Sequence, residues 1–369
     1  MHKYLEFLRY CIDSSLPLPE RAKNIDWKGL LAWAEQQAIV GICFGGIEKL
    51  KKSDIKIPFS ILMEWIGFAN RIEQQNHLVN KRCVELVREF KNAGFRCCLL
   101  KGQGNALLYD VGYKKEEGRY KSLLRQPGDI DLLVYGGRKV VTQYVKDRYP
   151  HTRTAYQHID YPVFKDVEVE LHYLPIYVNN PFYNYRLQKW FNKRTDDKCV
   201  IVELPDGIGG VPIPSNEYNI VYQLTHIMHH YFDEGIGLRQ MIDYYYVMRC
   251  IEDPLRLPLY KGRNLEETLK YLGLWKFAGA VMYVMREVFG LEEKYMIAPV
   301  DEKRGRSLLK EIIKGGNFGH HSNLDQNNAL KKYFQKIWRD LHFVRDYPAE
   351  ALCEPFFRTW HFFWRLSHR

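Results

Sequence analysis

The sequence lacks paired cysteines. Its eight cysteines are scattered singly, apart from the adjacent Cys97 and Cys98, and no C-x-x-C motif occurs. Zinc ribbons and dithiol redox sites need such pairs, so neither class of site is indicated. In a chain of 369 residues we expect the thiols to be buried apolar side chains rather than members of a disulfide framework.

Long apolar runs are also missing. No stretch approaches the roughly 18 apolar residues that a membrane-spanning helix needs, so we expect no transmembrane segment. The stretch from Met1 to Glu6 shows no basic segment followed by an apolar one, so a secretory signal is not predicted. Internal repeats and low-complexity tracts are absent. Together these absences predict a cytoplasmic globular protein.

Basic residues are in excess, with 54 Lys and Arg against 44 Asp and Glu, for a net charge of +10. Such an excess favours anionic partners, namely nucleotide phosphates, nucleic acid or a membrane surface, although it can also serve solubility alone. The 19 Phe, 26 Tyr and 8 Trp residues supply ample core material. The chain exceeds one typical domain of about 100–200 residues, so two or three packed units are expected.

The spacing of apolar residues divides the chain into a helical region (1–92), an α/β core (93–214) and a second helical region (215–369). The predicted fold class is α+β, with a small mixed β-sheet flanked by N-terminal and C-terminal helices. Helices are predicted to begin at residue 27 and to cover 61–92, 139–147, 218–231, 238–250 and 330–344. Strands are predicted at 95–100, 129–134, 154–159, 161–174 and 199–204. A polar loop is predicted at 110–127.

Two carboxylates lie on the second predicted strand. Asp129 and Asp131 are two residues apart, so their side chains point to the same face of a strand. Carboxylates this close repel each other, and a hard divalent cation such as Mg²⁺ or Mn²⁺ would neutralise them. A solvated strand end is the alternative interpretation of such a pair.

Two further elements accompany this pair. Lys101-Gly102-Gln103-Gly104 follows a predicted strand and precedes a helix, which offers backbone N–H groups and a lysine to a phosphate, although the P-loop spacing is absent. The alternation over 167–172 places Glu168, Glu170 and His172 on one strand face. A third carboxylate beside a glycine turn completes the parts that two-metal phosphoryl transfer requires.

Residues 95–175 resemble a bacterial family of uncharacterised nucleotidyltransferases within the polymerase-beta-like nucleotidyltransferase superfamily. The superfamily has a glycine turn, a D-x-D and a later carboxylate, which match Gly102, Asp129 with Asp131, and Glu170. The narrower family also matches Lys101-Gly102, Arg125 and Glu170-Leu171-His172. The chain departs from the superfamily pattern at two places that concern triphosphate binding. Gln103 replaces a small residue, and the stretch before Asp129 is long and basic.

The resemblance implies an enzyme that moves a nucleoside monophosphate from an NTP to a hydroxyl-type acceptor, which would be a small molecule, a protein side chain or an RNA end, and releases pyrophosphate. Asp129, Asp131 and Glu170 would hold two Mg²⁺ or Mn²⁺ ions, and Glu170 would assist removal of the acceptor's proton. The nucleotide would contact Lys101, Gly102, Gln103, Arg125, Gly128 and His172. Glu168 is the rival for the third acid.

Several other groups have a structural and a functional interpretation. His226, His229 and His230 share a helix without an H-E-x-x-H motif, so a structural or pocket role is favoured over zinc. Arg239 and Asp243 form either a helix-surface pair or a contact to the triphosphate. The aromatic side chains of the C-terminal helix would form a docking face, a membrane-surface helix or a nucleic-acid surface; they are Phe356, Phe357, Trp360, Phe363 and Trp364.

Two alternatives to the enzyme remain. One is a non-catalytic nucleic-acid-binding protein that keeps the fold and uses its positive charge. The other is a peripheral membrane protein that binds through its C-terminal helix.

Overall fold

A computed structural model describes residues 2–13, 15–110, 119–193, 199–233, 235–250, 264–316 and 342–367. It confirms the predicted α+β class, because a small mixed sheet is flanked by helices from both ends of the chain. One hydrophobic cluster contains residues from Phe7 to Ala351, so the N-terminal and C-terminal helices share a core. The boundaries of the three sequence regions therefore stay a prediction.

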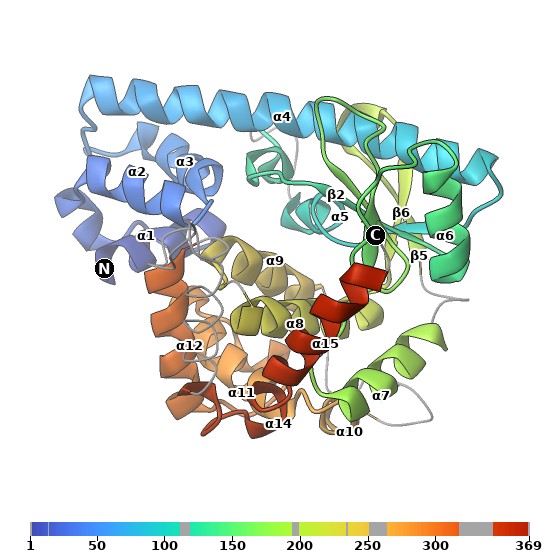
Figure 1. The fold of residues 1–369 in the computed structure, drawn as a ribbon. Helices are drawn as coiled ribbons and strands as arrows, with labels where there is room; N and C mark the ends of the chain where they lie inside the picture. The colour runs from blue at the N-terminus through green and yellow to red at the C-terminus, as the bar shows by residue number, and fades with distance from the viewer. Residues whose placement is uncertain are drawn as a thin grey trace.

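The N-terminal part consists of α1 (His2–Ile12), α2 (Trp27–Gln36), α3 (Val40–Lys49) and the long helix α4 (Phe59–Asn92). Most buried residues of α4 recur at alternating spacings of three and four, and this buried stripe joins the first hydrophobic cluster at its start and the second at its end, with Asn76 and Asn80 near the transition. The helix ends before Gly94, whose φ of +82° suits glycine. Figure 1 shows α4 running along the top of the molecule, above the N-terminal helices and the sheet.

The main sheet has four strands in the order β1-β2-β4-β3. Strands β1 (Cys97–Leu99) and β2 (Ile130–Val134) are antiparallel, β2 and β4 (Val169–His172) are parallel, and β3 (His158–Asp160) is antiparallel to β4. In the parallel pair, Asp131 lies opposite Glu170. Each strand predicted for this sheet has a counterpart in the structure, but each observed strand is shorter than the residue range predicted for it.

The two faces of the sheet differ in chemistry. Apolar residues of α4 and α6 (Gly137–Lys146) pack with Leu132, Val169 and Leu171 in a second hydrophobic cluster. The alternate residues of β2 and β4, among them Asp131, Glu170 and His172, occupy the other face. The alternation seen in the sequence thus separates a packed face from a polar one.

Short elements surround the sheet: α5 (Gln103–Ala106), α7 (Pro181–Asn192) and a hairpin of β5 (Cys199–Glu203) and β6 (Gly210–Pro214). Neither α7 nor β6 was predicted from the sequence, although the Asn180 side chain caps α7 and Pro181 begins it, a known helix start. Of the polar loop expected at 110–127, residues 111–118 lie outside the described part of the chain, and the end of the loop needs correction, since Leu123 to Arg125 are buried.

The C-terminal part is helical, as predicted. It contains α8 (Asn216–Asp233), α9 (Leu238–Arg249), α10 (Leu265–Tyr271), α11 (Trp275–Val284), α12 (Glu302–Gly315), α14 (Pro348–Ala351) and α15 (Glu354–Ser367). The helix predicted at 330–344 lies outside the described residues up to 341. Among the helices that the structure describes, none is long and apolar enough to cross a membrane.

Helix α15 runs from α14 toward the sheet (Figure 1), and aromatic side chains on it contact the α/β core. Tyr156 contacts the rings of Phe357, Trp360 and Trp364 at centroid distances of 5.5–6.0 Å. The docking prediction is confirmed for Phe357 and Trp364, whereas Trp360 contacts Tyr156 but stays 48% exposed. It is wrong for Phe356 and Phe363, which are 78% and 63% exposed.

The cysteines form no disulfide, as predicted, but burial is confirmed for only five of them, since Cys199, Cys250 and Cys353 are partly exposed. All eight are free, and Cys11, Cys43, Cys83, Cys97 and Cys98 are buried.

Glu350 is a buried acid in α14. Its carboxylate accepts a hydrogen bond from the backbone N–H of Asn179 at 2.8 Å. Burial raises the pKa of Glu350 from 4.5 to about 7, although the backbone hydrogen bonds to its carboxylate oppose this shift. The folded state therefore holds a proton that the unfolded state releases between pH 4.5 and 7, so the contribution to stability falls as pH rises through this window.

We expect the free energy of unfolding of the wild type to fall, relative to Glu350→Gln, by roughly 3 kcal/mol between the two ends of that window. Urea denaturation of both proteins across the window measures this difference. Since every other titrating group is common to the two proteins, parallel curves would contradict the assignment.

Candidate active site

The site is built on the polar face of the sheet, where three carboxylates converge. Asp129, Asp131 and Glu170 each offer one oxygen, and these atoms lie within 4.8 Å of one another. The parallel pairing of β2 and β4 produces this arrangement, because it sets Asp131 beside Glu170. Glu168 precedes β4 and is not part of the group. Of the two rival acids, the structure brings Glu170 to the D-x-D pair.

Two cationic side chains contact Asp131, which is only 4% exposed. Lys101 Nζ lies 2.7 Å and His172 Nε2 2.9 Å from Asp131 Oδ1. Burial alone would raise the pKa of Asp131, but Lys101 and His172 hold it well below its usual range. Burial would likewise lower the pKa of His172, yet its bonds to Asp131 and Glu170 raise it to about 9. The acids are thus countered by cations from the chain itself.

Asp129 is the most exposed of the three acids. Repulsion from Asp131, followed by desolvation, raises the pKa of Asp129 to about 6, although Lys101 opposes the shift. A carboxylate with this environment is stabilised by any added cation. The donor set therefore fits a hard divalent ion such as Mg²⁺ or Mn²⁺, which prefers carboxylate oxygens.

The glycine turn lies against the first acid. Gly102 has φ +53° and ψ −113°, a conformation that residues with side chains rarely adopt, and a Cβ added there would lie 3.7 Å from the carbonyl oxygen of Asp129. Gln103, which was expected to contact the nucleotide, is buried and donates instead to Asn76 Oδ1 at 3.1 Å and to Asn80. The turn is consequently anchored to α4.

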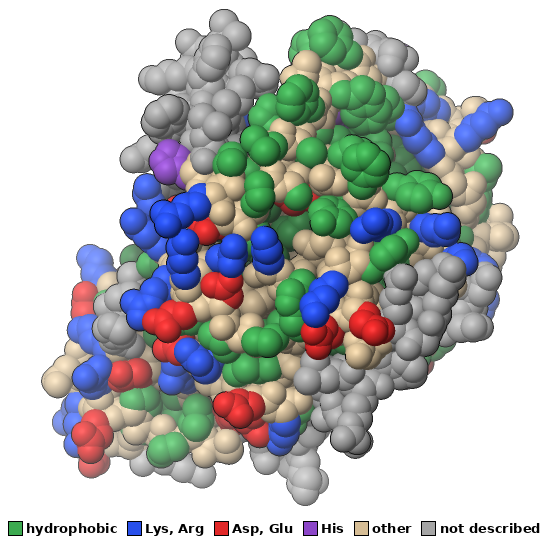
Figure 2. All heavy atoms as spheres, turned by 90° about the horizontal axis from the view of Figure 1, so that it is seen from below, with side chains coloured by type: hydrophobic (Ala, Val, Ile, Leu, Met, Phe, Trp, Pro, Cys, Tyr) green, Lys and Arg blue, Asp and Glu red, His purple; other side chains and the backbone are tan. Residues whose placement is uncertain are grey.

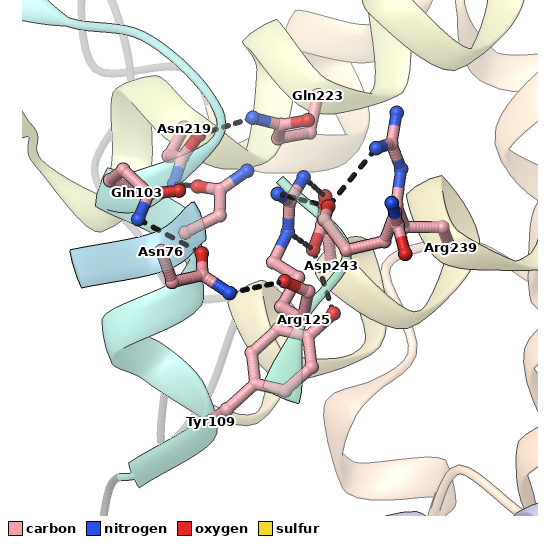
Figure 3. A network of polar contacts seen from close by, with 10 residues as sticks. Asn76, Gln103, Tyr109, Arg125, Asn219, Gln223, Arg239 and Asp243 are labelled. Carbon is pink, nitrogen blue, oxygen red and sulfur yellow. Dashed lines mark hydrogen bonds and ion pairs between the residues drawn. The ribbon is translucent and has the colours of Figure 1, made fainter. Parts of the chain in front are cut away.

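Arg125 is likewise bound to another part of the chain. Its guanidinium forms a two-pronged ion pair with Asp243 of α9, with both distances 2.7 Å, and Tyr109 donates to the same carboxylate (Figure 3). Arg125 was expected to use this fork on a phosphate. The structure places it on Asp243. Burial would lower the pKa of Arg125, but the Asp243 carboxylate outweighs this effect and raises the pKa above its usual value.

The expected surface pair of Arg239 and Asp243 is wrong, because both side chains are buried. Arg239 Nη1 donates to the carbonyl oxygen of Gln126 at 3.1 Å and lies beside Gly128. Burial and the neighbouring Arg125 lower the pKa of Arg239 to about 10. Helix α9 is therefore tied to the segment that leads into Asp129 at two points (Figure 3).

A cavity of about 800 Å³ opens beside Asp129. Its walls come from α2, the α2–α3 corner, α4, the segments before β2 and β4, and α9. The lining residues are Glu35, Ala38, Val40, Phe68, Arg71, Ile72, Gln75, Gln126, Pro127, Gly128, Asp129, Asp166, Val167, Glu168 and Arg239.

Histidines complete the surroundings. His158 was not predicted as a site residue, yet its Nδ1 lies 3.2 Å from Glu170 Oε2; no sequence pattern shows which strand pairs with β4. His226 and His230 of α8 contact each other, with 2.9 Å between their Nε2 atoms. Within the described part of the chain, no group of three potential metal ligands includes them, and their structural or pocket role stays a prediction.

Comparison with known proteins identifies the class. A model of the family described as "Uncharacterised nucleotidyltransferase" matches residues 23–290, so the chain belongs to that family. A crystal structure of an antigenic nucleotidyltransferase-like protein from Paracoccidioides brasiliensis is similar at 12% identity, over 62% of this chain and 96% of that one, with a TM-score of 0.35. A comparison with curated proteins finds no match.

Proposed function

We propose that the protein transfers a nucleoside monophosphate from an NTP to a hydroxyl-type acceptor and releases pyrophosphate. The observation that carries the proposal is the convergence of Asp129, Asp131 and Glu170, whose carboxylate oxygens lie within 4.8 Å of one another. The chain also belongs to a family of nucleotidyltransferases. Three carboxylates from two neighbouring strands are the ligand set that phosphoryl transfer with two divalent ions uses.

Each acid has a distinct place in this reaction. Asp129 and Asp131 would hold two Mg²⁺ or Mn²⁺ ions, and Glu170 would hold the one nearer the acceptor. These ions would offset charge on the phosphates and lower the pKa of the acceptor hydroxyl. The acceptor oxygen forms a bond to the α-phosphorus, the bond to the bridging oxygen breaks, and that oxygen leaves with pyrophosphate. Glu170 would accept the acceptor's proton.

The remaining residues divide into contacts and supports. Lys101 and the backbone of Gly102 and Gly128 would face the phosphates, while His172 would orient Asp131 and Glu170 through its hydrogen bonds. Arg125 and Gln103 would act as positioning residues, because their polar groups are bound to Asp243 and to Asn76 with Asn80. This revises the nucleotide contacts expected for Arg125 and Gln103.

A thermal-shift experiment tests the first step without an acceptor. The full chain would be melted with each of the four NTPs, in the presence and absence of Mg²⁺ or Mn²⁺. A ligand at a hundred times its Kd should stabilise the fold by about 2.7 kcal/mol. We expect a shift that needs both metal and NTP; no shift with any NTP would contradict the proposal.

The alternative of a nucleic-acid-binding protein predicts a different result. Its affinity for nucleic acid would fall steeply with salt and would not depend on the acids. On the face shown in Figure 2, Lys and Arg side chains are interspersed with Asp and Glu rather than gathered in one basic surface. That face does not favour this alternative.

A further inference from the structure

The cavity beside Asp129 bears on the identity of the acceptor, a role that rests on the proposed nucleotidyl transfer. Of the three converging acids, only Asp129 lines the cavity among the described residues. Lys101, which pairs with Asp131, does not line it. The cavity therefore adjoins the reaction centre without containing it, as the place of a second substrate requires.

The lining carries four acids and two bases, so its net charge is not positive. Asp166 is held by Arg82 through two hydrogen bonds, at 3.1 and 2.6 Å. Apart from Asp166 and Asp129, the acids are Glu35 and Glu168, and the bases are Arg71 and Arg239. This lining does not supply the excess of positive charge that a polyanion needs, because a phosphodiester backbone is bound mainly through Lys and Arg.

Neutral polar groups and apolar surface make up the rest. The amides of Gln75 and Gln126 can donate and accept hydrogen bonds, while Phe68 and Ile72 of α4 supply an apolar wall. A volume of about 800 Å³ falls within the 300–1,000 Å³ typical of small-molecule sites. Apolar walls with a few amide and charged groups suit a molecule that has both ring faces and hydroxyl groups.

The wall formed by the α2–α3 corner is fixed by hydrogen bonds. Gln37 is fully buried; its amide donates to the carbonyl oxygen of Ile312 at 3.2 Å and accepts from the N–H of Leu238 at 2.9 Å. The next residue, Ala38, lines the cavity with φ +55°, a conformation that is uncommon outside glycine. The corner joins the N-terminal helices to the start of α9, so this wall is preformed.

We propose that this cavity binds the acceptor, and that the acceptor is a small, hydroxyl-bearing molecule of sugar or nucleoside size without net negative charge. One of its hydroxyl oxygens bonds to the α-phosphorus of the NTP at the acids next to Asp129. Pyrophosphate leaves with the bridging oxygen, and the hydroxyl proton passes to Glu170. The N-terminal helices thereby determine which acceptor is used.

The test uses two tryptophan variants of the full chain. Gln75 and Gln74 are adjacent exposed residues of α4, but only Gln75 lines the cavity. Gln75→Trp puts an indole into the cavity, and Gln74→Trp puts the same group on the surface of the same helix. Each protein would receive NTP labelled at the α-phosphate, with Mg²⁺, and in separate reactions a dialysable small-molecule cell extract, total RNA or the protein fraction.

We expect the wild type and Gln74→Trp to label a compound in the small-molecule extract, and Gln75→Trp to label it at least about tenfold more slowly. The metal-dependent thermal shift with NTP should be the same in all three proteins. Label in RNA or protein alone, no labelled small molecule, or equal rates in the two variants would each overturn the acceptor assignment while NTP binding stands. If the wild type itself showed no metal-dependent thermal shift with any NTP, the proposed function would be rejected instead.

Discussion

Asp129→Asn should remove nucleotidyl transfer while leaving the fold intact or slightly more stable. The substitution deletes one charge from the cluster to which the divalent ions would bind, so we expect the rate to fall by at least about a thousandfold, equivalent to about 4 kcal/mol of transition-state stabilisation. The same charge is repelled by Asp131 in the metal-free protein, which is why the pKa of Asp129 is raised to about 6. Removing it therefore relieves repulsion.

The measurement pairs a rate with a melting temperature. Transfer from α-labelled NTP reports the reaction, and thermal melting without metal reports the fold. Asp131→Asn serves as the contrast, because it would leave Lys101 and His172 facing a neutral side chain in a buried site and should lower the melting temperature. An Asp129→Asn protein that retains wild-type transfer would reject the metal role of this acid.

The sequence was sufficient to locate this acid cluster because its signals are local. A D-x-D on a strand and the alternation of 167–172 place their carboxylates on one face whatever the rest of the fold does. The resemblance to a known family added the order of these elements along the chain. The pairing of Asp131 with Glu170, rather than with Glu168, depended on the parallel register of β2 and β4, which the local pattern does not specify.

Partners from distant parts of the chain were not predictable in the same way. Arg125 was expected on a phosphate, but its partner Asp243 is 118 residues away on α9. Nothing in the spacing of Arg239 and Asp243 distinguishes a solvated helix face from a buried one, since i, i+4 pairs occur on both. Likewise, His158 meets Glu170 through a strand pairing that no local pattern specifies.

The cavity shows the same limit most clearly. Its lining combines Glu35, Arg71, Gly128, Glu168 and Arg239, which five separate segments bring together. Each of these residues has an ordinary sequence context on a helix or loop. Only packing of the N-terminal helices against α4 and α9 makes them one surface, so the proposed acceptor site could not be located before the fold was known.

Asp243→Ala should be the most destabilising single substitution in the polar network of Figure 3. Asp243 is 4% exposed and accepts three hydrogen bonds of 2.7 Å from Arg125 and Tyr109. Truncation leaves the buried guanidinium of Arg125 without its carboxylate, with the second buried cation, Arg239, nearby. Breaking one side of a buried ion pair costs about 3–5 kcal/mol, and we expect the free energy of unfolding to fall by that amount.

A double-mutant cycle separates the ion pair from general packing. Urea denaturation would be measured for Asp243→Leu, Arg125→Met and the double variant. Because the double variant no longer buries the Arg125 guanidinium without its carboxylate, it should be more stable than the sum of the two single losses predicts, by more than about 1 kcal/mol. Strict additivity would show that the two side chains do not stabilise each other. A coupled pair, in contrast, means that α9 and the segment leading to Asp129 are held together by this contact, so the C-terminal helices fix the position of the first acid.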